Sequence, residues 1–370
     1  FTTTSGSTVQ ITTSATLDMP ETFASGTITL VNNDGATGAA DAALLTVNSN
    51  VLATYGAAVG SDSSELDITA TKKSSSAIAS ALSITTQEAT ALDNANTAVA
   101  SGDAAGYTAM NSVLNSGGTV AANAAEQVSV QADTVGADTA AAVAAGGQVL
   151  GAASTRLASL RSGSQYASTE GTGFATGGGG LPKTAWFKPF GNWIRQDTRN
   201  SIKGYDADTY GVAFGIDGAV NKKVRLGVSF AYSQTDVDGK GTGESKSDIN
   251  SYQGTVYGDY TAQKFYVEGM FAFSRNDTDT SRILNFGGLD RTVLGDYSSN
   301  QYMVKVGGGL PNKIKGNLFV TPTAGLSWTH VVSDSYTETG GGGFSQIVNP
   351  EDVDVIAASV GAKVHTKMKS

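Results

Sequence analysis

The chain has 370 residues, no cysteine, two histidines (His330 and His365) and a formal net charge of −9. The lack of cysteine excludes a disulfide framework, a thiolate zinc site and a cysteine nucleophile, and two histidines leave little material for a catalytic triad or a metal cluster. Net acidity argues against nucleic acid as a partner, because phosphate binding needs clustered Lys and Arg. We therefore expect no catalytic, metal or cofactor site, and no enzyme.

The two ends of the sequence carry no targeting signal. No run of 18 apolar residues is present, so no transmembrane helix is expected. Phe1 is followed by threonines, without the initiator Met or the basic residues of a signal peptide, and the chain stops at Ser370. We expect a fragment of a longer protein, truncated at both ends.

Charge and aromatic residues divide the chain into chemically different halves. Residues 1–135 hold 12 acidic and 2 basic side chains, whereas residues 184–370 hold 19 of each kind. Of the 29 aromatic residues, 23 lie at or beyond residue 184. Such an asymmetry predicts separate structural units.

The first unit, residues 1–75, is rich in Ser, Thr, Gly and Ala. Short alternating runs at 8–12, 27–31 and 44–47 lie among turn clusters of Asn, Asp and Gly. This pattern is typical of the rungs of a β-solenoid, and we interpret the segment as a remnant of a larger N-terminal region. A partly disordered, low-complexity tract is the alternative.

Residues 76–135 predict an Ala-rich helical junction, which Gly102, Gly106 and Gly117-Gly118 break into short pieces. A longer helix is predicted within residues 136–163, and a Gly/Ser-rich linker follows at 164–183. The helix has about 25 residues at ~1.5 Å each, close to the ~40 Å of a bilayer with its headgroups.

That longer helix is slender, because Ala, Gly and Ser occupy most of its positions. It is too small-sided and too polar at its end to face lipid, but its thinness suits the inside of a tube. Its bulk and charge are concentrated in Val149, Leu150, Arg156, Leu157, Leu160 and Arg161.

Beyond residue 184 the chain becomes a series of long alternating segments. Eight strands are predicted, each longer than the 9–11 residues of a tilted membrane-spanning strand: near 184–196, 208–220, 223–236, 247–261, 264–276, 297–310, 316–332 and 352–366.

One face of these strands is large and apolar, while the other is small or charged. The alternation predicts a lipid-facing set that includes Val212, Phe214, Ile216, Leu226, Val228, Phe230, Val267, Phe271 and Val304. It predicts lumen-facing charges at Asp217, Arg225, Glu268 and Lys305. Because a water-soluble sandwich also has one apolar face, alternation alone does not establish a membrane protein.

The lengths of the connections favour a barrel in the outer membrane. Short links alternate with long ones, as in barrels that have short periplasmic turns and long extracellular loops. The predicted long loops are 197–207, 237–246, 277–296 and 332–351. Because the inward residues are mostly Gly, Ala and Ser, we expect a lumen wide enough to hold the slender helix.

Three segments resemble one known family. Trp186 to Gly241 looks like the first three strands of the translocator (β) domain of monomeric autotransporters, and Ile249 to Arg282 resembles the next hairpin. Gly147 to Gly163 is similar to the helix that threads the pore of these type V secretion proteins. The family has twelve strands, so we expect that the C-terminal part of the barrel, about four strands, is missing.

This resemblance implies a mainly β fold: an antiparallel outer-membrane β-barrel with a central α-helix and an N-terminal β-solenoid and helical remnant. It implies a monomer in the outer membrane of a Gram-negative bacterium, with outer-membrane lipid, barrel-assembly machinery and periplasmic chaperones as partners and with its passenger, adhesin-like by default, at the cell surface. A stand-alone porin or receptor, or a carrier of a surface enzyme lying upstream, remain alternatives.

Two hypotheses concern single residues. The lumen-facing charges either hold the pore helix, through Arg156 or Arg161, or only solvate the lumen. Some members of the family cut their pore helix by asparagine cyclisation, but no Asn lies between Asn123 and Asn192. An aspartate version would use Asp138, with Glu268 as the acid.

Overall fold

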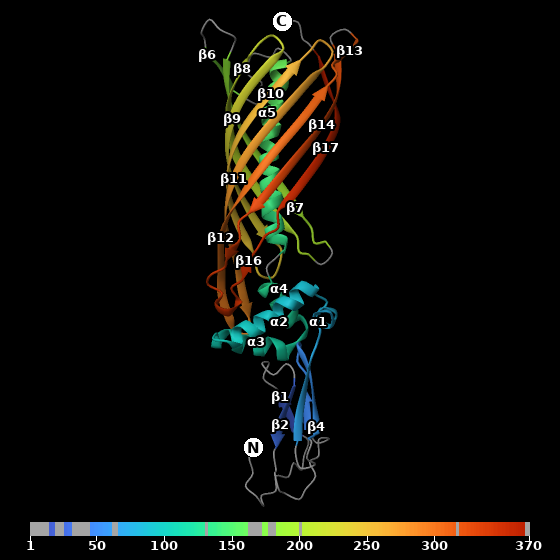
Figure 1. Cartoon of the computed structure of the whole chain (residues 1–370), viewed down its shortest axis with the longest axis vertical. Coiled ribbons are helices and arrows are strands. Elements are labelled where there is room, and N and C mark those ends of the chain that lie inside the picture. Colours follow the sequence, from blue (N-terminus) through green and yellow to red (C-terminus); the bar gives the residue numbers. More distant parts are fainter. Residues whose placement is uncertain are drawn as a thin grey trace, which may run out of the picture.

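The computed structural model describes residues 15–18, 26–31, 45–60, 66–129, 132–161, 172–176, 183–199, 202–315 and 318–366. The molecule is elongated, with short strands at the N-terminal end, a layer of helices in the middle and a tall curved sheet at the other end (Figure 1). The expected strand at 8–12 lies outside the described residues.

The N-terminal strands form two small groups. β1 (Ala15–Asp18) pairs in parallel with β3 (Leu45–Asn48). β2 (Gly26–Val31), β5 (Leu66–Lys72) and β4 (Ala53–Val59) form an antiparallel sheet in that order. Stacked solenoid rungs pair in parallel, so only the first pair has the expected geometry. The second sheet departs from it because β4 and β2 both pair antiparallel with β5.

Four short helices follow: α1 (Ser75–Leu82), α2 (Thr86–Ala100), α3 (Ala104–Ser116) and α4 (Gly118–Val128). We call them the helical cap, because they lie across one end of the curved sheet (Figure 1). None of the described helices is long and apolar enough to cross a membrane.

Some of the glycines expected to separate the cap helices lie between them, and one does not. Thr85 and Glu88 form a capping box at the start of α2. Gly102 separates α2 from α3, and Gly117, at φ +61°, separates α3 from α4. The prediction for Gly106 was wrong, since this residue lies within α3. A Cβ there would stand 2.9 Å from Cγ1 of Val99, so the glycine permits close packing of α3 against α2.

Helix α5 (Ala132–Arg161) has 30 residues and begins four residues before the predicted segment 136–163. At ~1.5 Å per residue it is about 45 Å long. It runs along the concave face of the curved sheet, from the helical cap to the far end (Figure 1).

The curved sheet is an antiparallel meander whose strands follow one another in chain order. The eight predicted strands are present as β7 (Lys183–Gln196), β8 (Tyr205–Ala219), β9 (Val224–Gly239), β10 (Lys246–Thr261), β11 (Tyr266–Phe286), β12 (Leu289–Gly309), β14 (Leu318–Ser333) and β17 (Val353–Thr366). Two short strands, β6 (Thr172–Thr176) and β13 (Asn312–Lys315), were not predicted.

The sheet is curved but open. Among the described residues, β6 pairs only with β7 at one side of the sheet and β17 pairs only with β14 at the other. The chain therefore forms a half-barrel around α5, and the predicted mainly β fold class with a central helix is confirmed.

One predicted loop was wrong. Residues 277–296 are not a loop, because β11 and β12 continue through them to a two-residue turn at Gly287 and Gly288. Both glycines have positive φ, +57° and +84°, as a type I′ hairpin turn requires. The polar Asp, Ser and Thr residues concealed the strands, yet alternate side chains here are buried, with Thr280 and Arg291 half-buried. We call residues 277–297 the hairpin tip.

The other connections follow the expected division by length only in part, because the predicted long loop 237–246 is reduced to residues 240–245. Residues 197–204, 240–245 and 334–352 link strands at the end of the sheet that carries the helical cap. The last of these contains the 3₁₀ turn η2 (Gly342–Phe344) and the small strands β15 (Tyr336–Thr337) and β16 (Ile347–Val348). Short turns at 220–223 and 262–265 lie at the opposite end.

Candidate functional site: the two faces of the half-barrel and its helical cap

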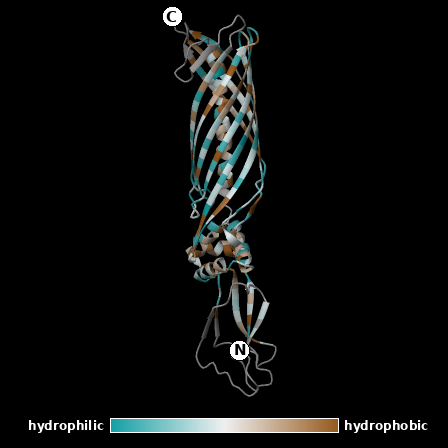
Figure 2. Cartoon of the chain, turned by 90° about the vertical axis from the view of Figure 1, so that its left-hand side faces the viewer, coloured by the Kyte–Doolittle hydropathy of each residue, from teal (hydrophilic) through white to brown (hydrophobic). Residues whose placement is uncertain are grey.

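The outer face of the half-barrel is apolar. All nine residues predicted to face lipid are exposed, with exposed fractions from 37% for Val212 and Val304 to 60% for Ile216. Their neighbours along the strands, such as Ala213, Ala231 and Ala272, are buried on the inner face. The strands accordingly change between hydrophilic and hydrophobic along their length (Figure 2).

Aromatic pairs border this apolar band. On the side of the band that faces the cap, Tyr232 and Tyr252 have ring centroids 5.3 Å apart, and Phe273 and Tyr302 are 5.4 Å apart. Toward the opposite end, Tyr260 lies 6.1 Å from Phe265. From Tyr252 to Tyr260 the strand rises about 26 Å, or about 20 Å at a tilt of ~40°, near the ~25 Å height of the apolar band of outer-membrane barrels.

The inner face carries acidic residues that contact α5. Asp217 accepts hydrogen bonds from Nε and Nη2 of Arg156, at 2.8 and 3.2 Å. Thr184 donates to the same carboxylate at 2.6 Å, and Asp217 is 4% exposed. Tyr257 donates to Asp217 at 3.2 Å and accepts from Nε1 of Trp186 at 2.6 Å. A polar network therefore joins the helix to β7, β8 and β10.

Arg161, the last residue of α5, has two acidic partners. Its guanidinium lies 2.9 Å from Asp259 and 2.9 Å from Glu268, and it stacks 3.8 Å from the ring centroid of Tyr266. Ser154, two turns earlier, donates a short hydrogen bond to Glu268. Asp259 was not among the predicted site residues, although the alternation on β10 places it on the inner face.

The remaining predicted charges have weaker contacts. Arg225 lies 3.8 Å from Asp259 and is partly exposed. Lys305 is half-buried on the inner face, opposite Met270 in the register of β11 and β12. Of the four charges, Asp217 and Glu268 thus contact the helix directly.

The helix packs on the sheet with small and apolar side chains. Val149, Leu150 and Leu157 are buried in one cluster with residues of the inner face, among them Trp186 and Tyr257. Leu160 is half-buried. A Cβ at Gly146 would lie 2.8 Å from Sδ of Met303, which shows how closely the small helix positions approach the strands.

The structure separates Asp138 from Glu268. Glu268 contacts Ser154 and Arg161, which lie 16 and 23 residues after Asp138 on the same helix, or about 24 and 35 Å along its axis. Asp138 instead accepts hydrogen bonds from Ser247 and from Tyr297. The hypothesis of an Asp138–Glu268 pair was therefore wrong, because the two carboxylates lie at opposite ends of the helix.

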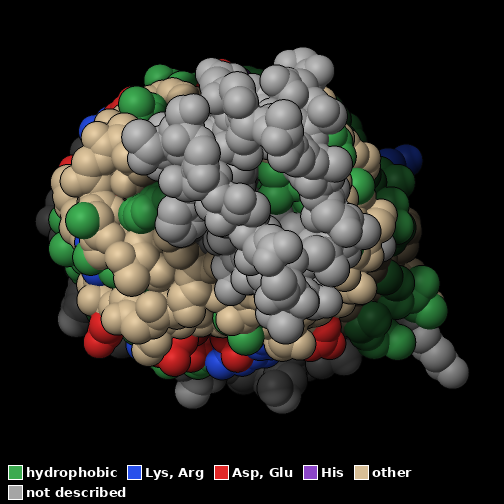
Figure 3. Space-filling view, turned by 90° about the horizontal axis from the view of Figure 1, so that it is seen from below, with side chains coloured by type: hydrophobic (Ala, Val, Ile, Leu, Met, Phe, Trp, Pro, Cys, Tyr) green, Lys and Arg blue, Asp and Glu red, His purple; other side chains and the backbone are tan. Residues whose placement is uncertain are grey.

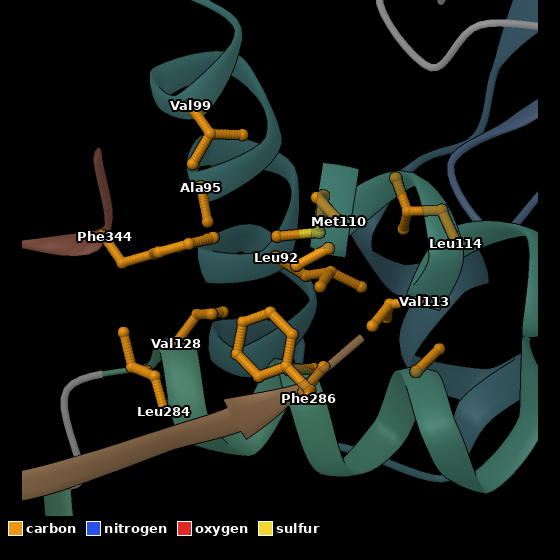
Figure 4. Packing of buried hydrophobic residues seen from close by; sticks show 14 of the residues in the cluster. Leu92, Ala95, Val99, Met110, Val113, Leu114, Val128, Leu284, Phe286 and Phe344 are labelled. Atoms are coloured by element: carbon orange, nitrogen blue, oxygen red, sulfur yellow. The ribbon is translucent and has the colours of Figure 1, made fainter. Parts of the chain in front are cut away.

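The helical cap and the half-barrel share one hydrophobic core. Leu284 and Phe286 from β11, Leu289 and Val293 from β12, and Phe344 from η2 are buried together with Leu92, Met110, Val113 and other cap residues. Figure 4 shows Phe286 pointing from the end of its strand into the space between the helices. The rings of Phe286 and Phe344 meet edge to face, with centroids 5.5 Å apart.

Two arginines of the hairpin tip form ion pairs beside this core. Arg282 forms an ion pair of 2.6 Å with Glu338, and both side chains are 7% exposed or less. It also donates to the carbonyl oxygens of Gln127 and Phe344. Arg291 pairs with Asp103, which is the N-cap of α3. Ion pairs and helix caps therefore join the hairpin to the cap.

The ionisation of Asp103 makes the stabilisation from its ion pair with Arg291 dependent on pH. The hydrogen bond from Arg291, together with backbone N–H groups of Gly106 and Gly343, holds the pKa of Asp103 well below its ordinary 3.8. Because the pKa is lower in the folded state, the stabilisation is fully present above pH 3.8 and is lost only as pH falls through the depressed value.

We expect hydrogen-exchange protection factors in α3 to stay constant from pH 7 to pH 5. Asp103→Asn should lower them about ten-fold throughout this range, because a charge-assisted hydrogen bond contributes ~1.5 kcal/mol. A fall in wild-type protection within this range would show that Asp103 is not held ionised by Arg291.

The cap end of the molecule has no broad basic area in the view from below. Figure 3 shows acidic side chains along one rim and few Lys or Arg among the described atoms of that face. This charge distribution gives no support for nucleic-acid binding there.

The geometry defines the class of protein. An antiparallel curved sheet with an apolar outer face, aromatic borders and a polar inner face around a helix is a β-barrel domain of the outer-membrane type. The family model described as "Autotransporter beta-domain" matches residues 185–370, and the chain belongs to this family. Its location in the bacterial outer membrane follows, and the predicted resemblance is confirmed.

Several curated relatives match over the same region. The chain is 29% identical over 224 residues to "Outer membrane protein B" of Rickettsia prowazekii, covering 57% of this chain and 14% of that protein. It is 30% identical over 193 residues to "Outer membrane protein A" of Rickettsia conorii, covering 50% of this chain and 10% of that protein. "Extracellular serine protease" of Serratia marcescens is 28% identical over 159 residues, covering 42% and 15%. The chain thus spans about a seventh of such relatives or less.

Two solved structures are also similar. The translocator domain of the autotransporter NalP from Neisseria meningitidis has a TM-score of 0.44 at 15% identity and covers 61% of this chain and 71% of its own. The β domain of the Bordetella autotransporter BrkA has a TM-score of 0.40 at 18% identity and covers 50% and 72%.

Proposed function

We propose that this chain is the membrane part of an autotransporter that delivers its own N-terminal passenger to the cell surface and anchors it there. The proposal is supported by the course of α5 along the half-barrel. The helix begins beside the helical cap, follows the inner face and ends near β7, so that the chain passes along the whole half-barrel. A stand-alone porin or receptor would have no need for such a segment before its first strand.

The inner-face ion pairs support a role for α5 as a plug. Arg156 and Arg161 pair with three carboxylates on the strands, and these contacts fix the last two turns of the helix. We propose that residues 136–163 close the lumen after export, with residues 164–183 as a linker and 184–370 as the barrel. In this division, residues 76–135 form the junction and residues 1–75 belong to the passenger.

The passenger is proposed to be adhesin-like. The β-domain itself carries no catalytic function, and the similar proteins of Rickettsia are named as outer membrane proteins. A relative named as an extracellular serine protease favours a surface enzyme as the second candidate for the passenger. The barrel-assembly machinery and periplasmic chaperones are proposed as partners in insertion, and a monomer is the expected state.

The test is expression in a Gram-negative host with the barrel completed to twelve strands. We expect a shift in gel mobility between boiled and unboiled samples, because a closed barrel resists detergent until heated. Protease added to intact cells should also remove residues 1–75 while the barrel stays protected. Absence of the shift, or a passenger that protease reaches only after lysis, would contradict the proposal.

A further inference from the structure

The first long strand of the half-barrel, β7, has an edge that must change partners when the barrel closes. A β-barrel spans a bilayer only when every strand is paired on both sides, so this edge has to meet the last strand of the closed barrel. In this chain the edge is occupied by β6, a short strand from the linker before β7. We propose that β6 covers the closing edge of β7 provisionally and that the last strand displaces it. This inference goes beyond passenger export, since it concerns how the barrel closes.

The direction of β6 is the first argument. β6 runs antiparallel to β7, with Thr172 opposite Phe187 and Thr176 opposite Lys183. Bacterial barrels of this type have an even number of antiparallel strands, so their last strand also runs antiparallel to their first. Both strands therefore need the same row of backbone N–H and C=O groups. Over residues 183–187, β6 and the last strand cannot pair with β7 at the same time.

The length of β6 excludes it as a permanent strand of the barrel wall. Its 5 residues fall short of the 9–11 that cross a membrane at the usual tilt. β7 has 14 residues, and residues 188–196 lie beyond the part that β6 covers. A last strand that crosses the membrane forms hydrogen bonds along those residues as well, which β6 does not reach. The longer partner is therefore favoured once it arrives.

The covered part of β7 lies at the end of the half-barrel opposite the helical cap (Figure 1). Two of its residues already contact the interior: Thr184 bonds to Arg156 and Asp217, and Trp186 donates to Tyr257. The inner face of this segment is thus fixed to α5 and to the neighbouring strands. Only its edge remains to change partner, so the last strand meets a β7 that is already in position.

A proline lies directly beyond the covered part of the edge. Pro189 follows Phe187, the last residue that β6 reaches, by two positions. Proline has no backbone N–H to donate and is typical of strands at the edge of a sheet. Exposed edges pair readily with other chains, and native sheets protect them with proline and with covering segments. β6 and Pro189 together therefore protect β7 from pairing with another molecule before closure.

Disulfide crosslinking in this cysteine-free chain tests the displacement. Phe174 and Ala185 are register partners, so Phe174→Cys with Ala185→Cys should form a disulfide under diamide while β6 is in place. We expect this crosslink in the chain that ends at Ser370. In the completed barrel, the band with heat-modifiable mobility should contain at least about ten-fold less of it, because several additional hydrogen bonds favour the longer strand.

A second pair, Thr172→Cys with Phe187→Cys, keeps Phe174 and should give the same two results. An equal yield of both crosslinks in the heat-modifiable band would overturn the displacement. Absence of both crosslinks from the shorter chain would overturn the pairing of β6 with β7. Either result is read whether or not residues 1–75 reach the cell surface, so it is independent of the test of export.

A proline substitution tests whether β6 protects the edge. Ala175→Pro removes a backbone N–H from β6 and leaves β7 unchanged. Combined with Ala185→Cys, it should raise disulfide-linked dimers of the newly made chain at least about three-fold, because the uncovered edges of two copies can pair. Ala167→Pro, in the same linker but outside β6, is the matched control and should leave the dimers at the level of Ala185→Cys alone. Equal dimer yields with the two prolines would overturn the protective role.

Discussion

Replacing Arg161 with alanine is expected to loosen α5 within the half-barrel and to raise the conductance of the completed barrel. The substitution leaves Asp259 and Glu268 buried without their shared cation, and Asp259 is 5% exposed. Removing one partner of a buried ion pair costs about 3–5 kcal/mol. We expect frequent openings in planar bilayers where the wild-type protein is mostly closed.

Arg161→Lys provides the control for charge. Lysine keeps the cation but loses the planar group that reaches two carboxylates and stacks on Tyr266, so its conductance should lie between wild type and alanine. Glu268→Ala should open the pore less than Arg161→Ala, because Asp259 still neutralises Arg161. Identical conductance of all three variants and wild type would mean that the inner-face charges only solvate the lumen.

The second large effect is expected at Arg282. Arg282→Ala removes the partner of buried Glu338 and the donor to the carbonyls of Gln127 and Phe344. The expected loss is about 3–5 kcal/mol in the docking of the helical cap. Protease sites in α2 to α4 should become accessible on intact cells, while heat-modifiable mobility of the barrel is unchanged.

A double variant separates charge from packing. In Arg282→Met combined with Glu338→Leu, no charge remains without its partner, and such replacements are often close to neutral in stability. We expect the cap to regain much of its resistance to protease. If the double variant were as sensitive as Arg282→Ala, the hydrogen bonds to the carbonyls of Gln127 and Phe344, rather than the ion pair, would hold the cap.

The inner and outer faces of the half-barrel were predictable from sequence because a strand has a fixed period of two. The alternation placed Phe214 and Val228 outside and Asp217 and Glu268 inside, and the structure has them there. The many small side chains of α5 predicted a helix surrounded by strands. The partners of Arg156 and Arg161 required coordinates, since side chains 61 to 107 residues apart carry no local signal.

The hairpin tip was predicted as a loop because its residues are polar, although polar residues can also form strands where one face of the strand lies in solvent. Asp277, Asp279 and Ser281 face outward to solvent beyond the apolar band, so their polarity costs nothing in a strand. The apolar partners of Leu284 and Phe286 lie in the helical cap, more than 150 residues earlier in the chain. For the same reason the pairs Arg282–Glu338 and Arg291–Asp103 could not be read from local patterns.

Helix α5 is held to the half-barrel by two distant sets of contacts. Arg156 and Arg161 form ion pairs near its C-terminus, and the helical cap that precedes its N-terminus packs on the half-barrel. If opening either set of contacts costs ~4 kcal/mol, each set would be open about one part in a thousand of the time. Because distant sites act additively, both would be undone together only about once in a million. In the proposed export, backward sliding of the chain into the periplasm requires both contacts to open at once, so the two contacts together favour the exported state.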